Sequence, residues 1–224
     1  MEKGKIAEIF SSIQGEGIYA GLRQIFVRCY GCNLNCNYCD TKLTVYEKYS
    51  PAKVYEMIQR FEGPYHSICF TGGEPLLQKD FLKTILGFIR HDGLTSYLET
   101  NGTLPDALSD LIDDIDIIAM DFKFPTSTGM RNFWQEHCEF LKTALKKNVF
   151  IKSIICFSTQ KEDLEMAVSI ISRVNKNVPF VLQPNFYEMS PSLLNKVRDL
   201  QKTALEKLDD VRIIPQIHKL VGVR

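Results

Sequence analysis

Three closely spaced cysteines, Cys32, Cys36 and Cys39, have the residue type and spacing to bind a metal centre. The pattern C-x₃-C-x₂-C supplies three thiolates, whereas a structural zinc ion takes four protein ligands in a closed site. An iron-sulfur cluster that is held by only three cysteines keeps one iron open to another ligand. The spacing therefore indicates a cluster with an open iron, which is able to do chemistry.

The other four cysteines do not extend this group into a disulfide framework. The chain has seven cysteines, an odd number, and Cys69, Cys138 and Cys156 are scattered through apolar segments. In a reducing compartment a tight cysteine group is more readily a metal site, and solitary cysteines behave as small hydrophobic residues. Cys29, three residues before Cys32, is interpreted as a packing residue. The alternative is a zinc site in which Cys29 or a histidine is the fourth ligand.

Two glycine-containing segments carry further polar residues. In TGGEP (71–75) the glycines let the backbone approach a ligand, and the Glu74 carboxylate at the rim can accept hydrogen bonds from an ammonium group. The alternative is a tight turn between a strand and a helix. The segment ETNGT (99–103) is interpreted in the same way, with a left-handed turn at Asn-Gly as its alternative.

Asp40 and Thr41 follow Cys39 directly and place a carboxylate and a hydroxyl beside the cysteine group. Hard oxygen ligands suit Mg²⁺, which keeps several of its waters and needs few protein ligands. A helix cap or a turn cap is the alternative role for these two side chains.

Strands and helices alternate along the chain. Apolar runs rich in β-branched and aromatic residues predict strands at 24–28, 67–71, 96–100, 116–123, 149–157 and 179–184. Apolar steps of three and four residues predict helices at approximately 51–62, 77–92, 131–147, 160–175 and 190–207. The alternation predicts an α/β fold with a parallel sheet. Because six strands are too few for a closed eight-stranded barrel, we expect a partial, open parallel β/α barrel of about six strands, with a doubly wound sheet as the alternative.

The unusual polar segments fall where the predicted strands end. In chain order they are RCYGC, TGGEP, ETNG, DFK and QPN. Active sites in parallel α/β folds lie beyond the C-terminal ends of the strands. We therefore expect one face of the sheet to gather nearly all of these residues.

Composition limits the partners. With 224 residues, 45% hydrophobic and 24% charged, the chain suits a single domain over 1–224 with a core that can bury a cofactor. Basic and acidic residues number 27 each, so we expect neither nucleic acid nor a membrane surface as a partner. We expect a small substrate instead. The N-terminus lacks an apolar h-region, and no stretch approaches the roughly 18 to 20 apolar residues of a membrane span. These features predict a cytoplasmic protein.

The cysteine group and the Gly-Gly-Glu loop resemble the radical S-adenosylmethionine (SAM) superfamily. The resemblance implies a single radical SAM domain in which Cys32, Cys36 and Cys39 hold a 4Fe-4S cluster. Its open iron chelates the amino and carboxylate groups of SAM, and one electron then cleaves the sulfonium to release a 5′-deoxyadenosyl radical. A reductant such as a flavodoxin or a ferredoxin is implied as a partner.

A second resemblance, to the 7-carboxy-7-deazaguanine synthase family, rests on short motifs in the family's order along the chain. They are SIQGEG (12–17), FVR (26–28), GCNL (31–34), TGGEP (71–75), ETNGT (99–103), DFK (121–123), LQP (182–184) and IPQIHK (214–219). The resemblance implies a Mg²⁺-dependent lyase reaction that converts 6-carboxy-5,6,7,8-tetrahydropterin to 7-carboxy-7-deazaguanine with loss of ammonia. The reaction is a step toward queuosine or archaeosine in tRNA, and the family often forms homodimers.

The same resemblance implies roles for individual residues. The substrate would contact Ile13, Gln14, Gly15 and Thr71, and Arg28 would bind its carboxylate. Thr41 would ligate Mg²⁺. The SAM site would be lined by Tyr38, Cys39, Asp40, Gly73, Glu74, Asp121, Phe122, Lys123, Gln183, Pro184, Asn185 and Phe186.

Some of these roles have plain alternatives. The planar guanidinium of Arg28 suits a bidentate carboxylate contact, but it also suits a surface salt bridge. Gln14 is either a substrate contact or a satisfied loop amide. His218 either caps the site or packs at the C-terminus. The chain ends in VGVR (221–224) where relatives often have a terminal proline, and DFK (121–123) stands where some have Ser-Pro-Lys.

Two other classes of protein compete with the synthase. A glycyl-radical-enzyme activase also has the cysteine group and the GGEP loop, but the segments QGEG (14–17) and PQIHK (215–219) argue against it. A non-enzymatic zinc or iron-sulfur module is the second alternative.

Overall fold

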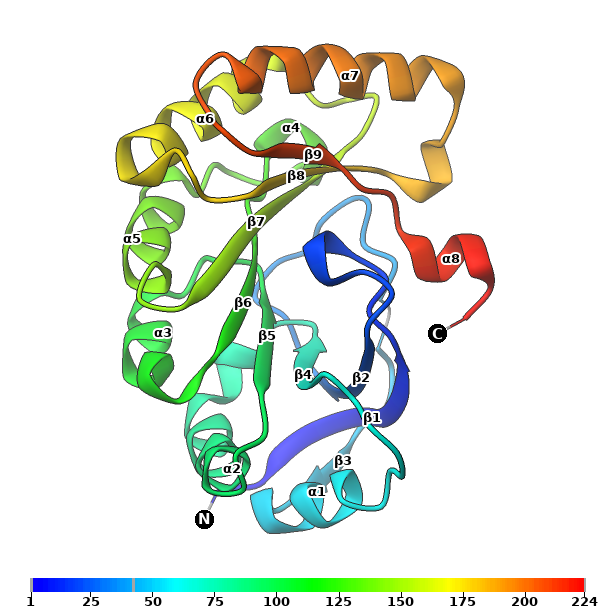
Figure 1. Cartoon of the computed structure of the whole chain (residues 1–224), viewed down its shortest axis with the longest axis vertical. Helices are drawn as coiled ribbons and strands as arrows, with labels where there is room; N and C mark the ends of the chain where they lie inside the picture. Colours follow the sequence, from blue (N-terminus) through cyan, green and yellow to red (C-terminus); the bar gives the residue numbers. More distant parts are fainter. Residues whose placement is uncertain (1, 42, 224) are drawn as a thin grey trace.

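A nine-stranded sheet forms the centre of the described part of the chain, residues 2–41 and 43–223 of this computed structural model. The strands follow the order β3-β1-β2-β4-β5-β6-β7-β8-β9, and because the two end strands do not pair, the sheet is open (Figure 1). Their bounds are β1 Gly4–Ile13, β2 Arg23–Cys29, β3 Glu47–Tyr49, β4 Ser67–Gly72, β5 Ser96–Thr100, β6 Ile117–Asp121, β7 Asn148–Ile155, β8 Phe180–Pro184 and β9 Val211–Ile213.

The six predicted strands are β2 and β4 to β8, and they run parallel to one another. The expected partial, open barrel is therefore confirmed. Three more strands extend it: β1 pairs antiparallel with both β2 and β3, and β9 pairs parallel with β8. Polar residues interrupt the apolar ones of β1, and β3 and β9 have only three residues each, so none of them shows a clear strand pattern.

The longer helices cover the convex face of the sheet (Figure 1). The predicted helices are α1 Pro51–Ile58, α2 Lys79–His91, α5 Trp134–Ala144, α6 Lys161–Asn175 and α7 Pro191–Leu205. Shorter ones are α3 Pro105–Leu111, α4 Pro125–Thr128 and α8 Ile217–Val221, with 3₁₀ turns η1 Gly17–Tyr19, η2 Pro75–Gln78, η3 Ile112–Asp114 and η4 Phe186–Glu188. Ser50 and Ser190 cap α1 and α7 by accepting from backbone amides in the first turn.

The inward-facing residues of the parallel strands change from apolar to polar along each strand. Residues two apart in a strand lie on the same face. The pairs are Phe26 and Arg28 on β2, Cys69 and Thr71 on β4, Tyr97 and Glu99 on β5, Ala119 and Asp121 on β6, and Phe150 and Lys152 on β7. The first member of each pair belongs to a small buried apolar cluster, and the second lines a cavity. The fold thus closes one end of the barrel interior with apolar side chains and presents polar ones at the other.

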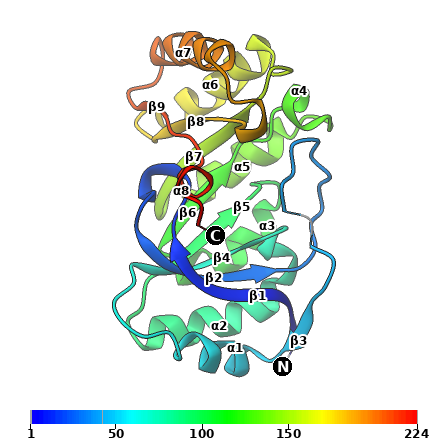
Figure 2. The ribbon, with the colours of Figure 1, turned by 90° about the vertical axis from the view of Figure 1, so that its right-hand side faces the viewer.

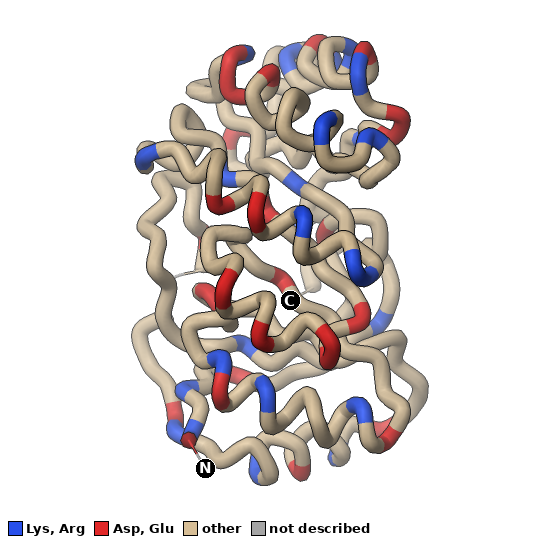
Figure 3. The backbone as a smooth tube through the Cα atoms, turned by 90° about the vertical axis from the view of Figure 1, so that its left-hand side faces the viewer, with Lys and Arg blue, Asp and Glu red and all other residues tan. Residues whose placement is uncertain are grey.

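Charges of both signs are interspersed over the helical face, as the balanced composition predicts (Figure 3). Within the described residues, no helix combines the length and the apolar character needed to cross a membrane. Figure 2 looks onto the opposite side of the barrel, where α8 lies near the open side of the sheet.

Candidate active site

A cavity of about 970 Å³ lies at the C-terminal ends of the parallel strands. All five polar segments that follow the predicted strands contribute to its lining, so one face of the sheet gathers them as expected. The predicted site residues that line it are Ile13, Gln14, Gly15, Arg28, Cys32, Cys36, Tyr38, Cys39, Asp40, Thr41, Thr71, Gly73, Asp121, Lys123 and Asn185.

The three clustered cysteines are free thiols in the loop that follows β2. Cys32 and Cys39 are exposed and Cys36 is half-buried. Burial raises the pKa of Cys36; the charge of Lys123 lowers it in part, and the charges of Asp121 and of the other two thiols raise it further. The Sγ atom of Cys32 lies 3.4 Å from the Leu34 amide, which donates to it. Backbone donors of this kind stabilise negative charge on sulfur.

This donor set fits a 4Fe-4S cluster. Thiolate sulfur is the ligand that such clusters take, and the cationic irons offset the repulsion between three neighbouring thiolates. Within the described residues, no three His, Cys, Asp or Glu side chains converge to hold a single metal ion. Each cysteine of a cluster binds a different iron, so the sulfur atoms need to surround a group rather than a point. Cys29, in contrast, is fully buried in the main core, which raises its pKa to about 12 and agrees with a packing role.

Gly72, the last residue of β4, and Gly73 directly after it are both required by close contact with the chain itself. Gly72 has φ +123°, a conformation that favours glycine, and a Cβ there would lie 2.1 Å from the carbonyl oxygen of Cys29. A Cβ on Gly73 would lie 2.0 Å from the carbonyl oxygen of Gly31. The loop is therefore packed against the backbone that leads into the cysteine group.

Glu74 does not lie at the rim, and this corrects the expectation from the sequence. Its side chain is fully buried. One carboxylate oxygen accepts from the Thr100 hydroxyl at 2.9 Å, and the other accepts from the Asn101 amide at 2.8 Å. Burial raises the pKa of Glu74 to about 7. The Thr100 hydroxyl at the end of β5 and the Asn101 amide after it are buried donors that need acceptors. Glu74 supplies both acceptors and so joins the loop after β4 to the end of β5.

Four more of the expected SAM contacts lie outside the cavity lining. Phe122 is buried and stacks on the ring of His137 with centroids 4.6 Å apart. Gln183 and Pro184 are buried at the end of β8, and Phe186 lies beside Lys219, whose Nζ is 5.3 Å from the ring centroid. Phe122 stands between Asp121 and Lys123, which line the cavity, so the step of one residue turns its side chain to the opposite face. Gln183, in contrast, lies two residues after Val181 on the inner face of β8, beside Glu16, and Phe186 belongs to the turn η4.

A hydrogen-bonded group on the inner wall joins three strands. Arg28 on β2 is in register with Thr71 on β4, whose hydroxyl donates to Glu99 on β5 at 2.6 Å. Gln14 donates to the other oxygen of Glu99 at 2.9 Å. Gln14 also donates to Gln24 at 3.0 Å and accepts from the Glu16 amide at 3.0 Å. The Gln14 amide is therefore both satisfied and part of the cavity wall.

Arg28 forms a salt bridge as well as lining the cavity. Its Nε lies 2.8 Å from a carboxylate oxygen of Glu8, and its guanidinium lies over the ring of Phe10 with 5.3 Å to the centroid. A guanidinium has five N–H donors, and this contact uses one.

The C-terminal segment closes one side of the cavity. The Ile217 amide donates to the Gly15 carbonyl at 2.8 Å. His218 lines the cavity and packs against Gly15, where an added Cβ would lie 1.8 Å from Nδ1. Lys219 pairs with Asp40 and lies over the ring of Tyr187, 4.6 Å from its centroid. Burial would raise the pKa of Asp40, but the hydrogen bond and charge of Lys219 outweigh it and lower the pKa.

Asp40 and Thr41 offer oxygen atoms next to the cysteine group. The Thr41 hydroxyl donates to Asp40 at 3.3 Å, and both residues line the cavity. None of the helices described for this chain begins at these residues, so the helix-cap alternative does not hold.

Two residues that the sequence did not single out as site residues are prominent in the cavity wall. The Glu99 carboxylate accepts hydrogen bonds from Thr71 and Gln14. Its position in the ETNGT segment is the feature of the sequence that could have identified it. Lys152 is buried on β7, where it pairs with Glu16 and approaches Asp121 to 3.5 Å. A lone lysine in the apolar run VFIKSIICF was the signal for it.

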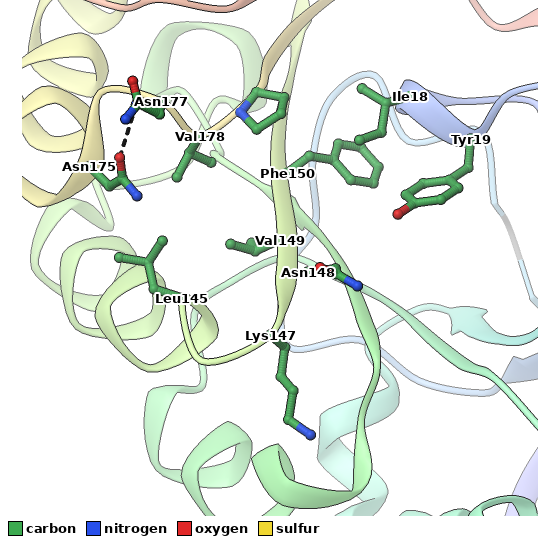
Figure 4. Close-up of a pocket in the computed structure, with 11 residues that line it drawn as sticks. Ile18, Tyr19, Leu145, Lys147, Asn148, Val149, Phe150, Asn175, Asn177 and Val178 are labelled. Atoms are coloured by element: carbon green, nitrogen blue, oxygen red, sulfur yellow. Dashed lines mark hydrogen bonds between the residues drawn. The ribbon is translucent and has the colours of Figure 1, made fainter. Parts of the chain in front are cut away.

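A second cavity of about 380 Å³ lies near the beginning of β7 and β8, away from the cysteines (Figure 4). Phe150 points toward Ile18 there, and Leu145, Val149 and Val178 lie on the other side of β7. Its lining includes neither a thiol nor a carboxylate, and the one lysine is 2.9 Å from a backbone carbonyl. The larger cavity is the one whose residues suit chemistry.

The fold and the cysteine-lined cavity define the class of protein. The Radical SAM superfamily profile matches residues 26–172, and the chain belongs to that superfamily. The solved structure of QueE from Escherichia coli has the same fold, with a TM-score of 0.68, 20% identity, and coverage of 96% of this chain and 95% of that one.

Sequence relatives define the family within this class. A 7-carboxy-7-deazaguanine synthase from Geobacter sulfurreducens is 37% identical over 97% of both chains. One from Archaeoglobus fulgidus is 35% identical over 99% of this chain and 100% of its own. The chain belongs to the 7-carboxy-7-deazaguanine synthase family, and the full-length match favours this over the activase and the metal-binding module.

Proposed function

We propose that this chain converts 6-carboxy-5,6,7,8-tetrahydropterin to 7-carboxy-7-deazaguanine and ammonia in a Mg²⁺-dependent reaction. The observation that carries the proposal is the single cavity that contains both the three cysteines and the group Arg28, Thr71 and Gln14. Substrate and product differ by ammonia alone, so no net oxidation is needed. The family membership over the whole chain supports the same reaction.

In this proposal the loop after β2 is the cofactor end of the cavity. Cys32, Cys36 and Cys39 would hold the 4Fe-4S cluster, which when bound would supply radical chemistry from SAM for hydrogen abstraction from the substrate. Tyr38, Gly73, Asp121, Lys123 and Asn185 line the part of the cavity assigned to SAM. The exposure of Cys32 and Cys39 leaves this end open to a reductant such as a flavodoxin or a ferredoxin.

The wall formed by β2, β4 and β5 is the substrate end. The pyrimidine half of a pterin presents adjacent N–H donors, and the Glu99 carboxylate can accept from them because it has more lone pairs than its two present donors use. Arg28 keeps guanidinium donors for the substrate carboxylate. Gln14 and Thr71 orient Glu99, and Ile13 and Gly15 pack beside them.

Mg²⁺ is assigned to Thr41, with Asp40 beside it. Both oxygens lie between the cysteine loop and the C-terminal segment. A divalent cation there would neutralise the substrate carboxylate while keeping several waters.

The test is anaerobic turnover after reconstitution with iron and sulfide, in the presence of SAM, reductant and the carboxylated pterin, with and without Mg²⁺. The proposal predicts 7-carboxy-7-deazaguanine and ammonia in equal amounts, with a large loss of rate when Mg²⁺ is chelated. Formation of 5′-deoxyadenosine without the deazaguanine would retain the radical chemistry and remove this substrate.

A further inference from the structure

Lys152 is a buried lysine in the wall of the cavity, on β7. Its side chain is only 7% exposed, and lysines are rarely buried unless they are paired. It faces inward, in register with Asp121 on the neighbouring strand β6. Neither the cluster nor the substrate assignment above uses it.

The Lys152 ammonium is held between two carboxylates. It forms an ion pair with Glu16, and its Nζ lies 3.5 Å from an oxygen of Asp121. Burial would lower the pKa of Lys152, but the charges of Asp121 and Glu16 outweigh it and raise the pKa. Burial would likewise raise the pKa of Glu16, but the charge and hydrogen bond of Lys152 lower it to about 2. Lys152 and Glu16 are therefore both charged at neutral pH.

The two carboxylates belong to different halves of the cavity. Glu16 follows the substrate residues Gln14 and Gly15, and it accepts from Gln216 of the C-terminal segment at 2.6 Å. Asp121 ends β6 at the SAM side and accepts from Lys123 at 2.7 Å. Lys152 thus contacts one residue from each half.

We infer that Lys152 is a positioning residue that fixes the substrate loop against the SAM side of the cavity, so that radical formation stays coupled to product formation. The inference rests on the proposed function. Hydrogen abstraction requires near contact between the reacting atoms, and a displacement of about 1 Å can cost on the order of a hundredfold in rate. The Lys152 ammonium, held between Glu16 and Asp121, fixes the distance between the substrate end and the SAM end of the cavity. None of these three side chains needs to touch the reacting atoms.

The first test compares Lys152→Met, Lys152→Arg and the exposed-lysine control Lys142→Met after reconstitution. We expect the amount of 7-carboxy-7-deazaguanine per 5′-deoxyadenosine to fall at least tenfold in K152M, to stay within about threefold in K152R and to be unchanged in K142M. A merely structural role would lower both products in parallel, and an unchanged ratio in K152M would overturn the inference.

The second test does not depend on turnover. Hydrogen exchange on the reconstituted proteins should show the Ile217 amide, which bonds to Gly15, exchanging at least about tenfold faster in K152M than in wild type and K142M. The double variant K152M/E16Q should be no worse than K152M, because both changes break the same link. Unchanged exchange, or additive effects, would overturn the inference. Wild-type protein that makes 5′-deoxyadenosine but no deazaguanine would instead remove the proposed function and leave the exchange result to decide on Lys152.

Discussion

The hydroxyl of Thr71 donates a 2.6 Å hydrogen bond to the carboxylate of Glu99 across strands β4 and β5. This contact places the Glu99 carboxylate at the wall of the cavity, where Gln14 donates to its second oxygen. The two donors, Thr71 and Gln14, were predicted from the sequence as substrate contacts. The acceptor Glu99 was not predicted as a site residue, although it belongs to the ETNGT segment. Glu99 is therefore the centre of the proposed substrate end.

Replacing Glu99 by glutamine should weaken substrate binding. The change keeps the size of the side chain and removes its charge and one acceptor. Because a hydrogen bond to a charged group contributes about 1.5–3 kcal/mol, we expect the KM for the carboxylated pterin to rise roughly 10- to 100-fold. Steady-state kinetics at saturating SAM measures this.

Thr71→Ser is the matched control for Glu99→Gln, since serine keeps the hydroxyl that donates to the carboxylate. Its KM should stay within about threefold of wild type. Equal KM values for E99Q and wild type would contradict the assignment of Glu99.

Replacing Gly15 by alanine should displace the C-terminal segment. The added Cβ would lie 1.8 Å from His218 Nδ1, so helix α8 has to move. We expect faster proteolysis of the last residues and a KM for the pterin raised about tenfold or more. Gly87→Ala is the control, because a Cβ there meets nothing within 4 Å and alanine stabilises a helix by about 0.5–1 kcal/mol. Intact α8 contacts in G15A would count against this role.

Replacing a cluster cysteine should abolish iron binding, whereas replacing Cys29 should not. Cys36→Ser removes one of the three thiolates in the loop after β2, and Cys29→Ala removes a thiol that is buried in the core. After anaerobic reconstitution we expect about four irons per chain in wild type and C29A, and little iron in C36S. Iron and sulfide analysis with the visible spectrum measures this, and normal iron content in C36S would contradict the ligand assignment.

Glu74 and His137 should give opposite pH dependences of stability. Burial raises the pKa of Glu74 from 4.5 to about 7, so its contribution to the free energy of unfolding falls as pH rises through that window. Burial lowers the pKa of His137 from 6.5 to about 4, so its contribution rises with pH between those values.

Glu74→Gln removes the falling contribution. Between pH 4.5 and 7 we expect the free energy of unfolding of the cluster-free protein to rise by about 3 kcal/mol more in E74Q than in wild type. Urea unfolding at several pH values tests this. The same pH profile in both proteins would mean that burial does not raise the pKa of Glu74 in the folded protein.

The parallel core of the fold was accessible from sequence because its signals are local. Apolar runs marked β2 and β4 to β8, and apolar steps of three and four residues marked α1 and α7. Strand β1 was not accessible in this way, because its apolar and polar residues form no clear strand pattern and it is a strand through its pairing with β2.

Motif membership predicted which segments meet at the cavity, but not which way each side chain points. Glu74 and Phe122 lie in loops that reach the cavity, but their side chains are buried away from the cavity wall. A turn or a step of one residue along the chain reverses the direction in which a side chain points. Lys152 was missed for the opposite reason. It belongs to no motif, and only the register of β6 and β7 brings it to Asp121.

The cluster and the reaction are tested together in a side-by-side assay of reconstituted wild type and C36S with SAM, reductant, Mg²⁺ and 6-carboxy-5,6,7,8-tetrahydropterin. Cluster content and 7-carboxy-7-deazaguanine are quantified in the same samples. We predict a brown wild-type protein with about four irons per chain that forms the deazaguanine, and a C36S protein that lacks both. A colourless zinc-loaded wild type would rule out the iron-sulfur cluster, and a fully loaded wild type that forms no deazaguanine would rule out the proposed reaction.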